Sequence, residues 1–83
     1  MWIRSQDKKI LTEIHDVEID SANQIWGSGS LIGEYSTEKN AMKVMDMIED
    51  RIRLSEMFKL HIYEPLNRID QFVFQLPKDE DVF

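Results

Sequence analysis

One amphipathic helix pattern, over residues 37–55, limits the folds open to this chain of 83 residues. Ser36 is a favourable N-cap, and Glu38 places a carboxylate in the first turn, where the helix dipole favours it. Apolar residues then recur at the spacing of three and four that is typical of one buried helix face, namely Ala41, Val44, Met45, Ile48 and Ile52. The helix therefore needs a second apolar surface to cover.

Short apolar stretches on both sides of this helix supply that surface, because their composition and alternation are typical of strands. We expect strands within residues 2–6, 10–20, 24–26, 31–35, 57–63 and 71–76. In residues 10–20, apolar and polar side chains alternate only in the second half. A bulge or break near His15-Asp16 would explain why the first half does not follow the same alternation.

Two of these segments have alternative interpretations. The Gly27–Ser30 segment is either a hairpin loop or a slack excursion within one interrupted strand. Met57–Tyr63 alternates like a strand, and a helical continuation is the alternative.

The pattern as a whole predicts an α+β fold, in which an antiparallel sheet of four to five strands carries the helix on one face. A chain of this length forms one domain, which we expect over residues 1–77, followed by an acidic flexible tail at 78–83.

The charges of this chain are unevenly distributed along its length. Between Ile10 and Glu38 there is no Lys or Arg, whereas the remaining ten acids of the chain are matched by ten basic residues. The stretch therefore accounts for the whole net charge of −6 through Glu13, Asp16, Glu18, Asp20, Glu34 and Glu38. Clustered negative charge favours basic partners and disfavours nucleic acid and anionic lipid.

Composition excludes several further classes of function. The chain has no cysteine, so it has no disulfide and no thiolate zinc site. No apolar run approaches the roughly 20 residues that span a bilayer. We expect a soluble cytoplasmic protein that binds no membrane and no cofactor.

No arrangement of residues indicates catalysis or metal binding, so we expect a protein that is not an enzyme. Gly27–Ser30 matches neither a nucleophile elbow nor a phosphate-binding loop. His15 and His61 lack the helical spacing of a zinc site, and surface histidines are the simpler interpretation.

Three segments resemble small uncharacterised proteins of Gram-positive bacteria and their phages. The matching segments are WIRSQD at 2–7, LIGEYSTEKNAMKVMDMI at 31–48 and FQLPKDEDV at 74–82. The chain departs from that family at Lys39, where the family often has an acid, and in Gly27–Ser30. The resemblance implies a bacterial or mobile-element origin and no particular activity.

Two functions follow as hypotheses. The first is a protein-interaction or regulatory protein, which binds a basic protein partner or forms a homodimer. The second is an inhibitor that mimics nucleic acid, such as an anti-CRISPR or another phage-encoded blocker of a DNA-binding protein. The residues that we expect to contact a partner are Glu13, Asp16, Glu18, Asp20, Trp26, Met42 and Met47. The simpler interpretations are a solvated outer sheet face for the acids and core packing for Trp26 and the methionines.

Overall fold

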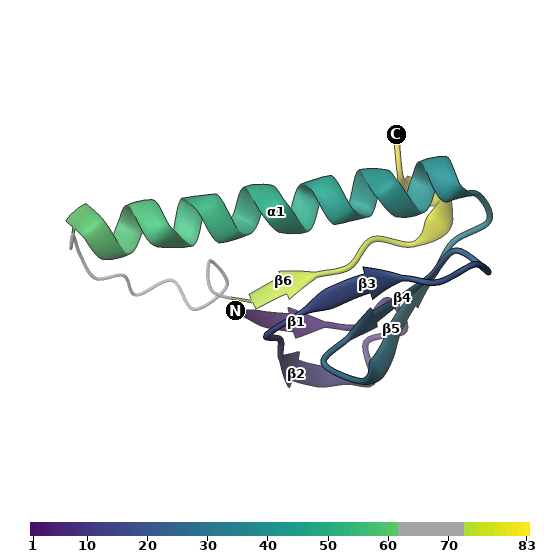
Figure 1. Cartoon of the computed structure of the whole chain (residues 1–83), viewed down its shortest axis with the longest axis horizontal. Coiled ribbons are helices and arrows are strands. Elements are labelled where there is room, and N and C mark those ends of the chain that lie inside the picture. The colour runs from purple at the N-terminus through teal and green to yellow at the C-terminus, as the bar shows by residue number, and fades with distance from the viewer. Residues whose placement is uncertain (62–72) are drawn as a thin grey trace.

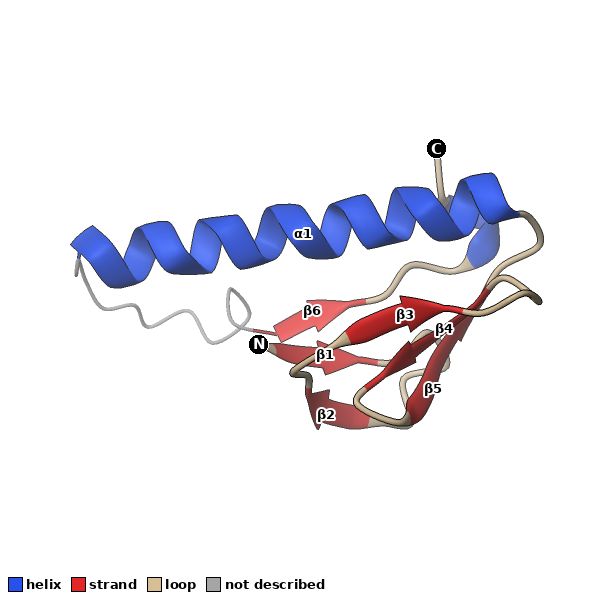
Figure 2. Cartoon of the chain, in the orientation of Figure 1, coloured by secondary structure: helices blue, strands red, loops and turns tan. Residues whose placement is uncertain are grey.

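The computed structural model describes residues 1–61 and 73–83, and it shows an α+β fold in which one long helix lies across short strands (Figures 1 and 2). The strands are β1 (Trp2–Arg4), β2 (Leu11–Glu13), β3 (Val17–Ile19), β4 (Gln24–Gly27), β5 (Ser30–Glu34) and β6 (Val73–Gln75); the helix is α1 (Glu38–His61), and a 3₁₀ turn, η2 (Asp79–Asp81), follows β6.

The strands form two three-stranded sheets, so the prediction of one antiparallel sheet of four to five strands is wrong in this respect. The first sheet has the order β2-β1-β6 and the second β3-β4-β5. All pairings are antiparallel except that of β1 with β6, which is parallel. The division falls at the expected break between β2 and β3, where Ile14 turns into the core and its backbone N–H donates to the carbonyl of Met1.

Gln6 joins the two sheets. Its backbone N–H donates to the carbonyl of Ile32, and its side chain exchanges two hydrogen bonds with the backbone of Glu34, at 2.9 Å each. Gln6 thereby satisfies backbone groups along the outer edge of β5, which would otherwise be an open strand edge.

A tight hairpin connects β4 to β5, which settles the alternatives for Gly27–Ser30 in favour of a loop. Gly27 pairs with Ser30, and the two residues between them, Ser28 and Gly29, both have positive φ angles of 47° and 88°. Two positive φ angles define the type I′ turn, whose twist matches that of the flanking strands.

Helix α1 begins at Glu38 and has 24 residues, so it is longer than predicted. Its N-cap is Thr37 rather than Ser36, since Thr37 Oγ1 accepts a hydrogen bond from the Asn40 N–H at 3.0 Å. The strand expected over Met57–Tyr63 is wrong for residues 57–61, which are helical, while 62 and 63 lie outside the described residues. No Gly or Pro interrupts residues 38–61, and Met57, Lys59 and Leu60 are good helix formers, so the helix continues through the short alternation to His61.

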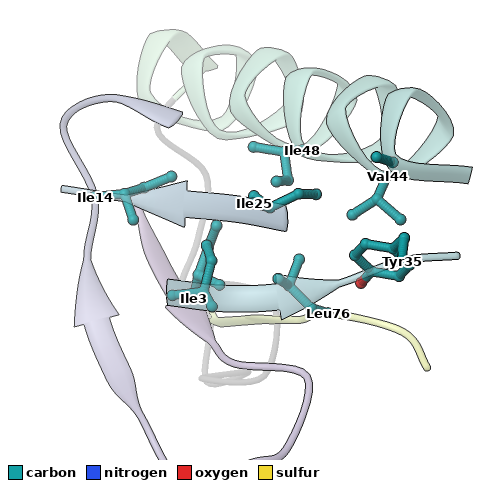
Figure 3. Packing of buried hydrophobic residues seen from close by; sticks show 9 residues of the cluster. Ile3, Ile14, Ile25, Tyr35, Val44, Ile48 and Leu76 are labelled. Carbon is teal, nitrogen blue, oxygen red and sulfur yellow. The ribbon is translucent and has the colours of Figure 1, made fainter. Parts of the chain in front are cut away.

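The core lies between the helix and the strands, where Val44 and Ile48 point from α1 toward Ile25 of β4, toward Leu76 just after β6 and toward Tyr35 (Figure 3). The prediction that Ile52 shares this buried face is wrong, because 41% of its surface is exposed. The helix is long compared with strands of three to five residues, and its C-terminal half runs past them (Figure 1).

The residues after β6 contact the start of the helix. Asp79 Oδ1 accepts hydrogen bonds from the Ser36 N–H and from Asn40 Nδ2, at 3.0 and 3.1 Å. Tyr35 donates its hydroxyl hydrogen to the carbonyl of Pro77, and burial raises the pKa of this tyrosine. Val82 packs against the core, so part of the segment predicted as an acidic flexible tail contacts the body of the domain.

Candidate protein-binding face

The outer side of the β3-β4-β5 sheet carries most of the acids from the base-free stretch. In β3, Val17 and Ile19 pack against the core while Glu18 is exposed. Backbone hydrogen bonds continue the ladder at both ends, from the Ser28 N–H to Asp16 O and from the Asp20 N–H to Gln24 O. Because side chains alternate along a strand, the acids at 16, 18 and 20 share this outer side.

Trp26 lies on the same side of the sheet, directly opposite Glu18 in the β3–β4 register. Its indole Nε1–H donates to Asp20 Oδ2 at 2.9 Å, which fixes the ring diagonally across the two strands. The indole is partly exposed.

Asp20 holds the turn between β3 and β4 as well as the indole. Its Oδ1 accepts hydrogen bonds from the N–H groups of Ala22 and Gln24, both at 2.9 Å. The hydrogen bond from Trp26, and then those from Gln24 and Ala22, lower the pKa of Asp20 below its ordinary value. Its carboxylate therefore stays ionised in a fixed position, and it is less free to contact a partner than Asp16 or Glu18.

Glu34 completes this surface, although the sequence analysis did not select it as a contact residue. Gln24 pairs with Glu34 in the β4–β5 register and donates from Nε2 to Glu34 Oε1 at 3.0 Å. We call the surface formed by Asp16, Glu18, Asp20, Trp26 and Glu34 the acidic sheet face. The alternation of Ser30–Glu34 is interrupted where the register shifts and Ile32 is left without a partner, so the sequence pattern gave no clear signal for Glu34.

The other predicted contact residues lie elsewhere. Glu13 is on the first sheet, opposite Trp2. Met42 and Met47 are 48% and 39% exposed on α1, and a step of five residues along a helix turns their side chains about 140° apart around its axis. They therefore flank the buried helix face on opposite sides and do not form one stripe.

Trp2 and Leu11 form a second exposed apolar feature, which the sequence analysis did not select as a site. They project from the outer side of β1 and β2 and are 42% and 58% exposed. The alternation of Trp2 and Arg4 around the buried Ile3 was the available signal.

The described residues contain few features suited to a small ligand. The hollow beside Gln6, lined by residues of the β1–β2 turn and β5, has a volume of about 80 Å³, which is small beside the roughly 300–1,000 Å³ of ligand pockets. Among the side chains that the structure describes, those of residues 1–54 and 73–83, no three His, Asp or Glu gather to hold a metal ion. No helix in the described part of the chain has the length and apolar character needed to cross a membrane.

Comparisons with known proteins found no matching protein family, no matching curated protein and no matching solved structure.

Proposed function

We propose that this protein is a non-enzymatic protein-binding module that receives a basic partner on its acidic sheet face. The observation that carries the proposal is the combination of an indole fixed by Asp20 with the exposed carboxylates of Asp16 and Glu18 on the same side of β3 and β4. Aromatic side chains and complementary charge are the usual means by which an exposed surface recognises a protein.

Charge decides which partner fits this face. The carboxylates repel phosphate groups, so nucleic acid and anionic lipid are poor ligands. A partner with exposed Lys or Arg gains attraction during approach and at contact. The proposal includes the cytoplasmic location that the sequence predicts.

Site-specific photo-crosslinking in a lysate of the source organism tests this proposal. A crosslinking amino acid at position 18 samples the acidic sheet face, and the same amino acid at the exposed position 46 samples the outside of α1. We expect a partner to be captured from position 18 and not from position 46. We also expect this capture to be lost when the crosslinking is carried out at higher salt. Equal capture from both positions would contradict the proposal.

The nucleic-acid mimic remains a second candidate because Asp16 and Glu18 project from one side of the ladder. Residues two apart on a strand are separated by about 6.5–7 Å, similar to the distance between neighbouring phosphates. Asp20 weakens this candidate, since its two carboxylate oxygens already accept three hydrogen bonds within the chain. The mimic requires that the captured partner bind DNA or RNA and release it when this chain is added.

A homodimer is a further proposal, based on exposed apolar side chains such as Trp2, Leu11 and Leu54. Light scattering at increasing protein concentration tests it directly, because a dimer doubles the measured mass. A constant monomer mass at high concentration would exclude it.

A further inference from the structure

We infer that Trp26 and Glu18 together form a recognition site for an arginine side chain of the partner. This inference rests on the proposed function and names the group that the acidic sheet face would bind. Its two components are an aromatic ring with a fixed orientation and an exposed carboxylate directly across the strand pair.

The indole is already ordered before any partner arrives. The Asp20 carboxylate accepts three hydrogen bonds at 2.9 Å, two from backbone N–H groups of its own turn and one from Trp26 Nε1–H. These bonds fix the position of the carboxylate and the orientation of the indole ring. A side chain whose rotamer is fixed in the free protein loses less conformational entropy on binding. Trp26 is therefore suited to be an anchor rather than an adaptable contact.

Glu18 supplies the second half of the site. Residues directly opposite on antiparallel strands have Cβ atoms about 4.5–5.5 Å apart, which brings the Glu18 carboxylate within reach of a group resting on the indole. Glu18 is exposed, and it makes no side-chain hydrogen bond or salt bridge to the other residues that the structure describes.

A guanidinium group fits this pair of partners better than an ammonium group. Its planar face stacks on an indole, while its edge donates two parallel hydrogen bonds to one carboxylate. A lysine ammonium is a more strongly hydrated point charge without that fork.

The occupant is identified by charge complementarity. The acidic sheet face comes from a stretch without Lys or Arg. In the described part of the chain, the ion pair between side chains joins Glu49 to Arg53 on α1. Within those residues, no Lys or Arg forms an ion pair with a carboxylate of the face, so a basic segment of the partner would provide the cation.

NMR titration of the ¹⁵N-labelled full chain with a tetra-arginine peptide tests the inference. The indole N–H of Trp26 is the reporter, and that of Trp2 is the internal reference. Trp2 also stands opposite an exposed glutamate, Glu13, but Arg4 lies on the same side of its own strand, and its indole makes no hydrogen bond to the other residues that the structure describes. We expect the Trp26 signal to shift and the Trp2 signal to stay, and we expect no shift with tetra-citrulline, whose side chains have a similar shape and no charge.

Two variants with the same change of net charge separate the site from general electrostatics. Glu18→Gln should weaken peptide binding by about threefold, the size expected for one exposed ion pair, while Asp46→Asn on the outside of α1 should leave it almost unchanged. An undisturbed amide spectrum confirms that each variant is folded.

Any of three results would overturn the inference: equal shifts of the two indole signals, equal binding of tetra-lysine, or equal weakening by the two variants. If one of these occurs while the partner is still captured from position 18, the proposed function stands and only the arginine site falls. Absence of capture from position 18 would contradict the proposed function itself.

Discussion

At the scale of single residues, Asp20 has two separate tasks that different oxygen atoms perform. Oδ1 stabilises the turn between β3 and β4, and Oδ2 orients the indole of Trp26. Recognition of an arginine by Trp26 depends on the second task, because an unfixed indole would be a weaker anchor.

Asp20→Asn should separate the two tasks. An asparagine carbonyl can still accept the two backbone hydrogen bonds, whereas its NH₂ group is a donor and cannot accept the indole N–H. We expect several-fold faster hydrogen exchange at the Trp26 indole in this variant, together with weaker binding of tetra-arginine. Exchange at the wild-type rate would show that the Asp20–Trp26 bond does not hold the ring in solution.

Asp79 should make the stability of the domain depend on acid pH. Hydrogen bonds from the Ser36 N–H and then from the Asn40 side chain lower the pKa of Asp79 below its ordinary value of 3.8. The folded state therefore favours the charged form, and this contribution is complete above pH 3.8 and lost as pH falls through the lowered pKa of the folded state.

Urea unfolding at a series of pH values from about 5 to 2 measures this effect. We expect the unfolding midpoint of wild type to fall with acidification, and that of Asp79→Asn to fall less, because asparagine accepts the same hydrogen bonds without titrating. The exposed Asp81 provides the matched control, and Asp81→Asn should behave like wild type. Parallel curves for all three proteins would contradict this role of Asp79.

At the scale of elements, the start of α1 shows how distant residues decide between neighbouring caps. The sequence alone indicates Ser36 as the cap, because serine ranks above threonine at this position. The backbone N–H of Ser36 is bound by Asp79, 43 residues later, and Thr37 is the residue whose hydroxyl caps the helix. A local pattern cannot contain that information.

Replacing the cap should lower stability by a predictable amount. Thr37→Val keeps the shape of the side chain and removes its oxygen, so we expect it to lower the free energy of unfolding by about 1 kcal/mol. Thr37→Ser keeps the oxygen and should stay close to wild type. Chemical denaturation distinguishes the two, and similar losses in both variants would contradict the assignment of the cap.

The same contrast between local and distant information explains which strands the sequence predicts. The alternation around Val17 is local and led to a correct strand, and the local signals at Gly27–Ser30 gave the hairpin loop as one of two alternatives. The parallel pairing of β1 with β6 joins residues about 70 positions apart, and no local pattern encodes it. The acids of β3 could be placed on one side from alternation alone, whereas the Asp20–Trp26 bond required the hairpin register.

Two isoleucines on α1 test how far along the helix its packing against the strands extends. Ile48 is 1% exposed and Ile52 is 41% exposed, although helical spacing gave both the same predicted role. We expect Ile48→Ala to lower the free energy of unfolding by about 2–5 kcal/mol, and Ile52→Ala to lower it by less than about 1 kcal/mol. Equal losses, measured by urea denaturation, would mean that the covered part of α1 extends to Ile52.

At the scale of the whole molecule, folding brings most acids of the base-free stretch onto one surface. The sequence shows only that these acids are close together along the chain. Four of the six acids between Ile10 and Glu38 lie on the acidic sheet face, while Glu13 lies on the other sheet and Glu38 begins α1. The described basic residues lie on other elements, including the β1–β2 turn and α1. The molecule therefore presents different charge to partners that approach from different sides.

Binding of the partner captured from position 18 to two charge-reversed proteins tests the central claim most directly. One protein carries Asp16→Lys, Glu18→Lys and Glu34→Lys on the acidic sheet face; the other carries Asp46→Lys, Asp50→Lys and Glu80→Lys at exposed positions outside that face. Both have the same net charge, so calorimetric titration separates the contribution of the face from that of total charge. We predict that the first set raises the Kd at least about 100-fold and the second by less than about tenfold. An equal rise in Kd for both proteins would show that the partner responds to net charge, and it would contradict the account.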